Sequence, residues 1–136
     1  MKAIRTVFRI FIFFLLVCSP THIFAQVHVL LDHWYNHEVS SKTGQPFHYL
    51  WTDTLNSGFS QFGEIFISNG GVVSMLEKPA NAKDLSGADI YIIVDPDTTS
   101  ENPSPNYISD KSAKAIAKWV KRGGVLLLMA NDGPNC

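Results

Sequence analysis

A short apolar run near the middle of the chain, Ile90–Val94, constrains the fold more than any other stretch. Most of its residues are β-branched and none is charged, which is typical of a strand buried on both faces of a parallel sheet. The acidic turn Asp95-Pro96-Asp97 follows it directly. Because ligands of open α/β sheets bind in the crevice beyond the carboxyl ends of the strands, this turn is a candidate floor of a site.

Three other stretches share the strand pattern, and helical patterns separate them. The further strands are expected at Val27–Leu31, Val72–Leu76 and Val125–Met129. Helices are expected over residues 58–69 and 109–123, and residues 77–89 are long enough to return the chain to a parallel neighbour. This order predicts an α/β fold with a doubly wound, mostly parallel sheet.

Each expected helix has a start signal and an apolar face. Ser57 and Ser109 are placed to cap the two helices, and glycines follow both. In the second helix an apolar stripe at i, i+3, i+4 and i+7 should face the core. It comprises Ala113, Ile116, Ala117 and Val120.

The last expected strand, Val125–Met129, indicates whether the domain is complete. We expect Val125–Met129 to be buried, as a central strand of a parallel sheet is, and such a strand is normally covered by a following helix. Only six residues follow Ala130. The pattern therefore predicts a domain that is truncated at its C-terminus.

The first 25 residues have the layout of a secretory signal peptide. A basic start is followed by the apolar run Ile10–Val17 and the break Ser19-Pro20, with cleavage expected between Ala25 and Gln26. The apolar run is shorter than the roughly 20 residues that span a bilayer, so no transmembrane segment is expected. Lipidation at Cys18 is the alternative, which the bulky neighbour Val17 disfavours. The prediction is a secreted or periplasmic protein in which residues 26–136 form one domain.

Charge and cysteine content narrow the function classes. Beyond residue 25 the chain carries eight basic and 12 acidic residues, a net charge of −4. A nucleic-acid-binding surface needs a basic stripe, so nucleic acid is not an expected partner. Cys136 is the only cysteine of that segment, so no internal disulfide is expected to hold the fold.

Polar residues follow three of the expected strands. They are Asn36 and Glu38 after the first strand, Asp95 and Asp97 after the third, and Asn131 and Asp132 after the fourth. If these strand ends converge, their oxygen atoms would suit calcium, magnesium or the hydroxyl groups of a sugar. The alternative is that these residues only build turns, by accepting bonds from nearby amides.

An aromatic segment adds two further candidates. Trp51 could stack on a sugar ring and Asp53 follows it closely, although an aromatic cluster packed over the sheet explains the same residues. His33 and His37 are four residues apart, but nothing around them predicts a helix, and zinc is not expected. The expected turn after the fourth strand carries Asn131 and Asp132 and no nucleophilic Ser or Cys.

Several motifs together resemble a known family. In chain order they are Tyr35-Asn-His-Glu38, Phe47-His-Tyr-Leu-Trp-Thr-Asp53, Asn56-Ser-Gly-Phe59, Gly63-Glu-Ile-Phe66, Tyr91-Ile-Ile-Val-Asp-Pro-Asp-Thr98, Pro105-Asn-Tyr-Ile108, Trp119-Val-Lys-Arg-Gly-Gly-Val125 and Asn131-Asp132. The series resembles the accessory domain that follows the catalytic barrel in many secreted bacterial unsaturated rhamnogalacturonyl hydrolases. That domain is similar in fold to class I glutamine amidotransferases and flavodoxin-like proteins.

The resemblance implies a role in the breakdown of pectin. The family's catalytic aspartates lie in a barrel that this sequence does not contain, and the amidotransferase cysteine is missing from the expected turn. We therefore expect a non-catalytic accessory domain whose partner is a plant cell-wall oligosaccharide or a glycoside hydrolase catalytic domain. Two alternatives stay open: hydrolysis of unsaturated uronyl oligosaccharides by the sheet-edge carboxylates, and a purely structural or partner-docking module.

Overall fold

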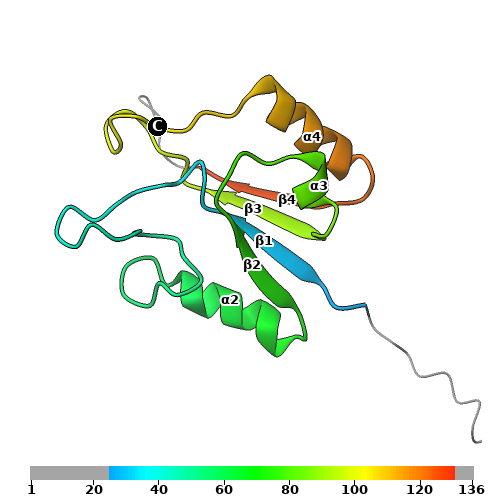
Figure 1. Ribbon diagram of the computed structural model, residues 1–136. Coiled ribbons are helices and arrows are strands. Elements are labelled where there is room, and N and C mark those ends of the chain that lie inside the picture. The colour runs from blue at the N-terminus through cyan, green and yellow to red at the C-terminus, as the bar shows by residue number, and fades with distance from the viewer. Residues whose placement is uncertain (1–24, 131–136) are drawn as a thin grey trace, which may run out of the picture.

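The computed structural model describes residues 25–130, which form a four-stranded, all-parallel sheet with helices on both faces (Figure 1). The predicted α/β character is therefore confirmed. The predicted signal peptide, the alternative lipidation site Cys18, Cys136 and the candidates Asn131 and Asp132 lie outside the described residues. No helix of residues 25–130 is long and apolar enough to cross a membrane.

The elements follow one another in the predicted order, with one addition. They are β1 (His28–Asp32), α2 (Phe59–Ser68), β2 (Val72–Leu76), α3 (Ala82–Leu85), β3 (Ile90–Val94), α4 (Asp110–Val120) and β4 (Val125–Met129). Three strands have the predicted bounds, and β1 is shifted by one residue. The short helix α3 was not predicted; the side chain of Asn81 caps it by accepting bonds from the amides of Lys83 and Asp84.

The sheet order is β2-β1-β3-β4, so the two central strands are β1 and β3. β3 is buried along nearly its whole length, as its apolar run predicts. Because successive side chains of a strand point to opposite faces, each central strand contributes to two separate cores. These cores lie on the α2 face and on the α3/α4 face of the sheet (Figure 1).

Aromatic rings fill the core on the α2 face. Phe59, Phe62 and Phe66 lie on one side of α2 and contact Trp51, whose ring stacks on Phe59 with centroids 5.9 Å apart. The indole Nε1 of Trp51 donates to the carbonyl of Ser74 on β2 at 2.9 Å. The segment around residue 51 is thereby fixed over the sheet.

The start of α2 differs from the prediction. Gly58, in a left-handed conformation with φ 67°, is the N-cap residue and makes no side-chain capping bond. Ser57 instead donates its hydroxyl to Asp53 at 2.6 Å and lies 3.4 Å from the amide of Phe59. Ser109 does cap α4, as predicted, by accepting a bond from the amide of Ser112.

The prediction that β4 is buried was wrong. β4 lies at the edge of the sheet and pairs only with β3 among the described strands. Val125 is 55% exposed and Leu128 is 60% exposed. In the apolar stripe of α4 only Ile116 is buried, while Ala113, Ala117 and Val120 stay exposed. The apolar composition of a strand does not by itself determine whether a neighbouring element covers it.

Candidate functional site

The loops that follow β1 and β3 are joined at the carboxyl edge of the sheet. The side chain of Asn36 donates from Nδ2 to the carbonyl of Asp95 at 3.0 Å. The amide of His37 donates to Oδ1 of Asp97 at 3.1 Å, and the amide of Asp97 donates to the carbonyl of Tyr35 at 2.8 Å. The candidates Asn36, Asp95 and Asp97 therefore lie together.

Asp97 is the anchor of this junction. It is 5% exposed, and its second oxygen, Oδ2, accepts a bond from Nδ2 of Asn102 at 2.7 Å. Both carboxylate oxygens are thus used to hold backbone or side chains of the surrounding loops. Its role in the described geometry is to position the loops.

Asp95 has a different environment. Its φ of 45° is in the left-handed region, which a short polar residue tolerates better than most. This turn lets its amide donate to the carbonyl of Met129 at the end of β4, at 2.7 Å. Its carboxylate makes no hydrogen bond or ion pair within residues 25–130, so it is free to meet a ligand.

Glu38 pairs with a histidine from the next loop. Its Oε2 lies 3.2 Å from Nδ1 of His48. Burial raises the pKa of Glu38; His48 opposes this, and the nearby carboxylates of Asp97, Glu101 and Asp95 raise the pKa further. A carboxyl group in such surroundings holds its proton at higher pH than a solvated one.

The loop that carries His48 is strained. His48 and Tyr49 have positive φ values of 61° and 46°. Such conformations cost about 1–3 kcal/mol each and are over-represented at functional sites. Contacts that hold them here include the ion pair with Glu38, a bond from the amide of Tyr49 to Oγ of Ser57, and an edge-to-face contact of Tyr49 with Phe59.

Buried polar atoms without a hydrogen-bond partner in the described residues also lie at this edge, in His33, Tyr35 and Asn36. His33 is 2% exposed, and neither of its ring nitrogens has a hydrogen-bond partner within the described chain. Burial and the neighbouring His37 lower the pKa of His33, against the opposing effect of Glu77 and Asp97. Oδ1 of Asn36 is likewise buried without a partner in residues 25–130.

Sequence reasoning did not single out the buried pair at the end of β1. The hydroxyl of Tyr91 donates to Oδ2 of Asp32 at 2.5 Å, while Oδ1 accepts from the amides of Trp34 and Tyr35. Burial raises the pKa of Asp32, and these hydrogen bonds only partly offset it. The pair fixes the start of the loop that carries Asn36 and Glu38.

The other two predicted candidates, Trp51 and Asp53, do not join this cluster. Trp51 packs on α2, so its ring is not presented as a platform for a ligand. Both oxygens of Asp53 are occupied, Oδ1 by the amides of Leu55 and Asn56 and Oδ2 by the amide and hydroxyl of Ser57. Asp53 therefore organises the loop before α2.

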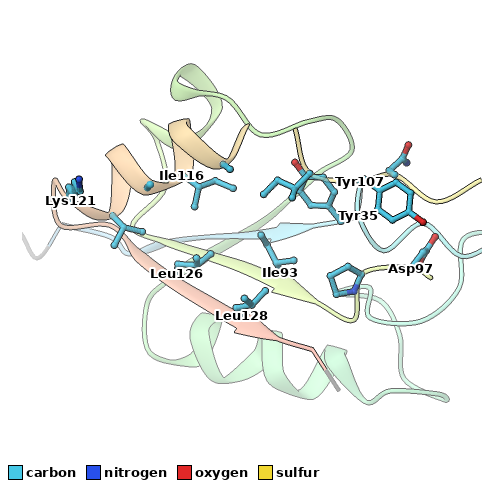
Figure 2. A pocket seen from close by; sticks show the side chains of 14 residues that line it. Tyr35, Ile93, Asp97, Tyr107, Ile116, Lys121, Leu126 and Leu128 are labelled. Atoms are coloured by element: carbon cyan, nitrogen blue, oxygen red, sulfur yellow. The ribbon is translucent and has the colours of Figure 1, made fainter. Parts of the chain in front are cut away.

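An apolar groove of about 670 Å³ runs between α4 and the sheet and ends at the carboxyl edge (Figure 2). Asp97 and Tyr107 lie at this end, and Lys121 lies at the other. Tyr107 is 70% exposed. Nδ2 of its neighbour Asn106 donates to the carbonyl of Trp34 at 2.9 Å, which ties the Tyr107 loop to the loop after β1. Sequence reasoning did not propose Tyr107 as a site residue. Its position as an aromatic residue within a Pro- and Asn-rich loop could have indicated it.

The polar groups at this edge suit a polar organic molecule. No group of three or more His, Cys, Asp or Glu side chains in the described ranges is placed to hold a metal ion. Carboxylates that the protein does not saturate can accept hydrogen bonds from hydroxyl groups, and an exposed tyrosine ring can pack on an apolar ring face.

Comparisons with known proteins identified no relative of this chain. No family model matches the chain, and neither a curated protein nor a solved structure matches it.

Proposed function

We propose that this chain is a secreted, non-catalytic carbohydrate-associated domain that acts in the breakdown of pectin. The proposed ligand is a rhamnogalacturonan-type oligosaccharide, bound at the carboxyl edge of the sheet. The observation that carries the proposal is the junction of the β1 and β3 loops through Asn36 and Asp97. The carboxylates of Glu38 and Asp95 interact electrostatically at this junction, and Asp97 lines the same groove as the exposed ring of Tyr107.

Each part of this edge suits a feature of a sugar. Sugar hydroxyls donate hydrogen bonds, and the carboxylates of Glu38 and Asp95 accept them. The ring of Tyr107 offers an apolar face with a hydroxyl at its tip. Because hydrogen bonds within the protein already hold these loops, binding costs little ordering of the backbone.

The motif series and the strand order support the same proposal. The order β2-β1-β3-β4 is that of the first four strands of a flavodoxin-like sheet. We propose on this basis that residues 26–136 are the N-terminal part of an amidotransferase-like domain. The signal-peptide pattern of residues 1–25 supports export, and the missing nucleophile after Ala130 supports a non-catalytic role.

Affinity electrophoresis in gels that contain rhamnogalacturonan tests the binding. Wild-type protein should be retarded relative to a gel without polysaccharide. Tyr107→Ala should raise the dissociation constant by about tenfold, the equivalent of ~1.4 kcal/mol. Leu55→Ala is the matched control, because Leu55 is 91% exposed and lies in another loop. Unretarded wild-type protein would overturn the proposed binding of the polysaccharide.

A second candidate function rests on Glu38. General acids of glycoside hydrolases are carboxyl groups whose pKa is raised, paired with a second carboxylate. The raised pKa of Glu38 beside Asp95 and Asp97 favours hydrolysis of an unsaturated uronyl disaccharide. Turnover of this disaccharide by the wild-type protein, lost in Glu38→Gln, would establish the hydrolase function. An absence of turnover by the wild-type protein would refute it.

A further inference from the structure

His33 is a buried histidine at the start of the loop that follows β1. Only 2% of the residue is exposed, and neither ring nitrogen has a hydrogen-bond partner in residues 25–130. Its amide donates to the carbonyl of Leu76 at the end of β2, at 2.9 Å, and its carbonyl lies 3.3 Å from Nδ1 of His37. The backbone around the imidazole therefore holds the ring inside the protein.

Titratable groups from three segments of the chain act on this ring. His37 lies in the same loop, with its ring centroid 5.2 Å from that of His33. Glu77 follows β2 and Asp97 follows β3, and both act on His33 electrostatically. Burial and His37 disfavour a charge on His33, the two carboxylates favour it, and on balance the pKa of His33 is lowered.

None of the carboxylates around the ring is placed to neutralise a charged His33. Glu77 is exposed, so solvent and salt screen its charge. Both oxygens of Asp97 already accept bonds from the surrounding loops. The oxygens of Asp32, the residue before His33, are likewise occupied. Because both nitrogens of an imidazolium are donors, a charged His33 must break existing bonds or move into water.

We propose that His33 is a pH-sensitive switch, in which protonation of the imidazole releases the loop of residues 33–38 from the loop that follows β3. The released ring reaches water, and the hydrogen bonds that join the two loops are lost with it. Histidine is the side chain that gains its charge between about pH 8 and about pH 5. The switch is a property of the protein alone and is independent of the proposed glycan binding.

The loop of residues 33–38 is suited to open while the sheet stays folded. Oδ1 of Asn36 and the hydroxyl of Tyr35 are buried, and neither has a partner in residues 25–130. Such atoms gain hydrogen bonds to water when the segment opens. β1 is paired on both sides by parallel strands, so its own ladder does not depend on the loop. Local opening of this kind costs less free energy than global unfolding.

The direction of the pH dependence follows from the burial of a neutral imidazole. The pKa of His33 in the folded protein lies below its usual 6.5, so the neutral form favours the closed loop. The contribution of neutral His33 to the stability of the closed loop is fully present above pH 6.5. It is lost as the pH falls through the lowered pKa.

An NMR titration of the full chain from about pH 8 to about pH 4 tests the proposal. We expect the ring resonances of His33 to titrate with a midpoint below 6.5. The amides of His37 and Asp97, which bond to the opposite loop, should shift with the same midpoint and lose their protection from hydrogen exchange. The amide of Leu31 within β1 should stay protected.

Three results of the wild-type titration would overturn the proposal. One is a His33 ring that does not titrate in this range, or that titrates at or above 6.5. Another is a set of loop amides that do not follow the ring. The third is a loss of protection at Leu31 with the same midpoint, because the whole sheet would then unfold.

Variants of three histidines assign the transition to one ring. His33→Phe keeps an aromatic ring that cannot gain a proton, and the amides of His37 and Asp97 should then stay protected throughout. His37→Gln removes the neighbouring like charge and should raise the midpoint of His33. His28→Gln is the matched control, because His28 is exposed at the start of β1, and it should leave the transition unchanged.

A loop transition that survives His33→Phe with an unchanged midpoint would assign the switch to another group and overturn the proposal. If His33→Phe does not fold, the midpoints of the ring and of the loop amides in the wild-type protein decide the question on their own.

Discussion

The hydroxyl of Tyr91 donates a hydrogen bond of 2.5 Å to Oδ2 of Asp32, and both side chains are almost fully buried. The pair joins the two central strands at the point where β1 passes into the loop that carries Asn36 and Glu38. It therefore links the core of the sheet to the candidate site.

Removing the Tyr91 hydroxyl should destabilise the fold. Tyr91→Phe leaves Oδ2 of Asp32 buried without this donor, at a cost of about 1–3 kcal/mol in the free energy of unfolding. Tyr35→Phe is the control, because the hydroxyl of Tyr35 is buried and has no hydrogen-bond partner in residues 25–130. Urea denaturation should show a clear loss for Tyr91→Phe and none for Tyr35→Phe. Equal losses would contradict the assigned bond.

The same pair predicts how Asp32 titrates. Burial raises the pKa of Asp32 above its usual 3.8, so the protonated form favours the folded state. The contribution of protonated Asp32 to the free energy of unfolding is fully present below pH 3.8. It is lost as the pH rises through the pKa of Asp32 in the folded state. Carbon-detected NMR of the carboxyl group should give a midpoint above 3.8, and Tyr91→Phe should move it higher. A midpoint at or below 3.8 would refute the desolvated environment.

Asp53 should contribute stability with the opposite dependence on pH. Burial tends to raise its pKa, but the hydrogen bonds from Ser57, Asn56 and Leu55 lower it to about 2. Since this folded-state value lies below 3.8, the contribution is present above pH 3.8 and is lost as the pH falls towards 2. Asp53→Asn should unfold more easily at pH 5 and show a flatter acid limb in urea titrations. An acid limb as steep as that of wild type would argue against this role.

The packing of Trp51 on α2 can be tested at Gly63. A Cβ at this position would lie 2.9 Å from Cε3 of the Trp51 ring, which its bond to Ser74 holds in place. Gly63→Ala should therefore lower the free energy of unfolding by about 1–3 kcal/mol, despite the better helix propensity of alanine. Gly87→Ala is the control, because nothing lies within 4 Å of its Cβ. A stabilised Gly63→Ala protein would mean that the ring is not fixed there.

Much of the sheet could be predicted because its strands are short apolar runs with clear ends. Ile90–Val94 is the best example, since its β-branched composition indicated a strand buried on both faces. The helix α3 has only four residues and thus no periodicity to detect. The edge position of β4 depends on which elements lie beside it, which the composition of Val125–Met129 does not encode.

The candidate site could be predicted only in part. Asn36, Asp95 and Asp97 follow parallel neighbours, so topology alone brings them to one edge. Trp51 was ambiguous from the start, because an aromatic residue near a polar loop suits either a ligand or a core. The Asp32–Tyr91 pair could not be foreseen, since its two residues are far apart in sequence and the register between β1 and β3 decides their contact.

The central claim is that a pectic oligosaccharide binds at the carboxyl edge of the sheet. The most direct test is an amide NMR titration of the protein with a rhamnogalacturonan oligosaccharide. We expect saturable shifts for His37, Asp95 and Tyr107, while the amides of Leu55 and Ser57 in the Asp53 loop stay unchanged. Shifts that do not saturate, or that are confined to the Asp53 loop, would contradict it.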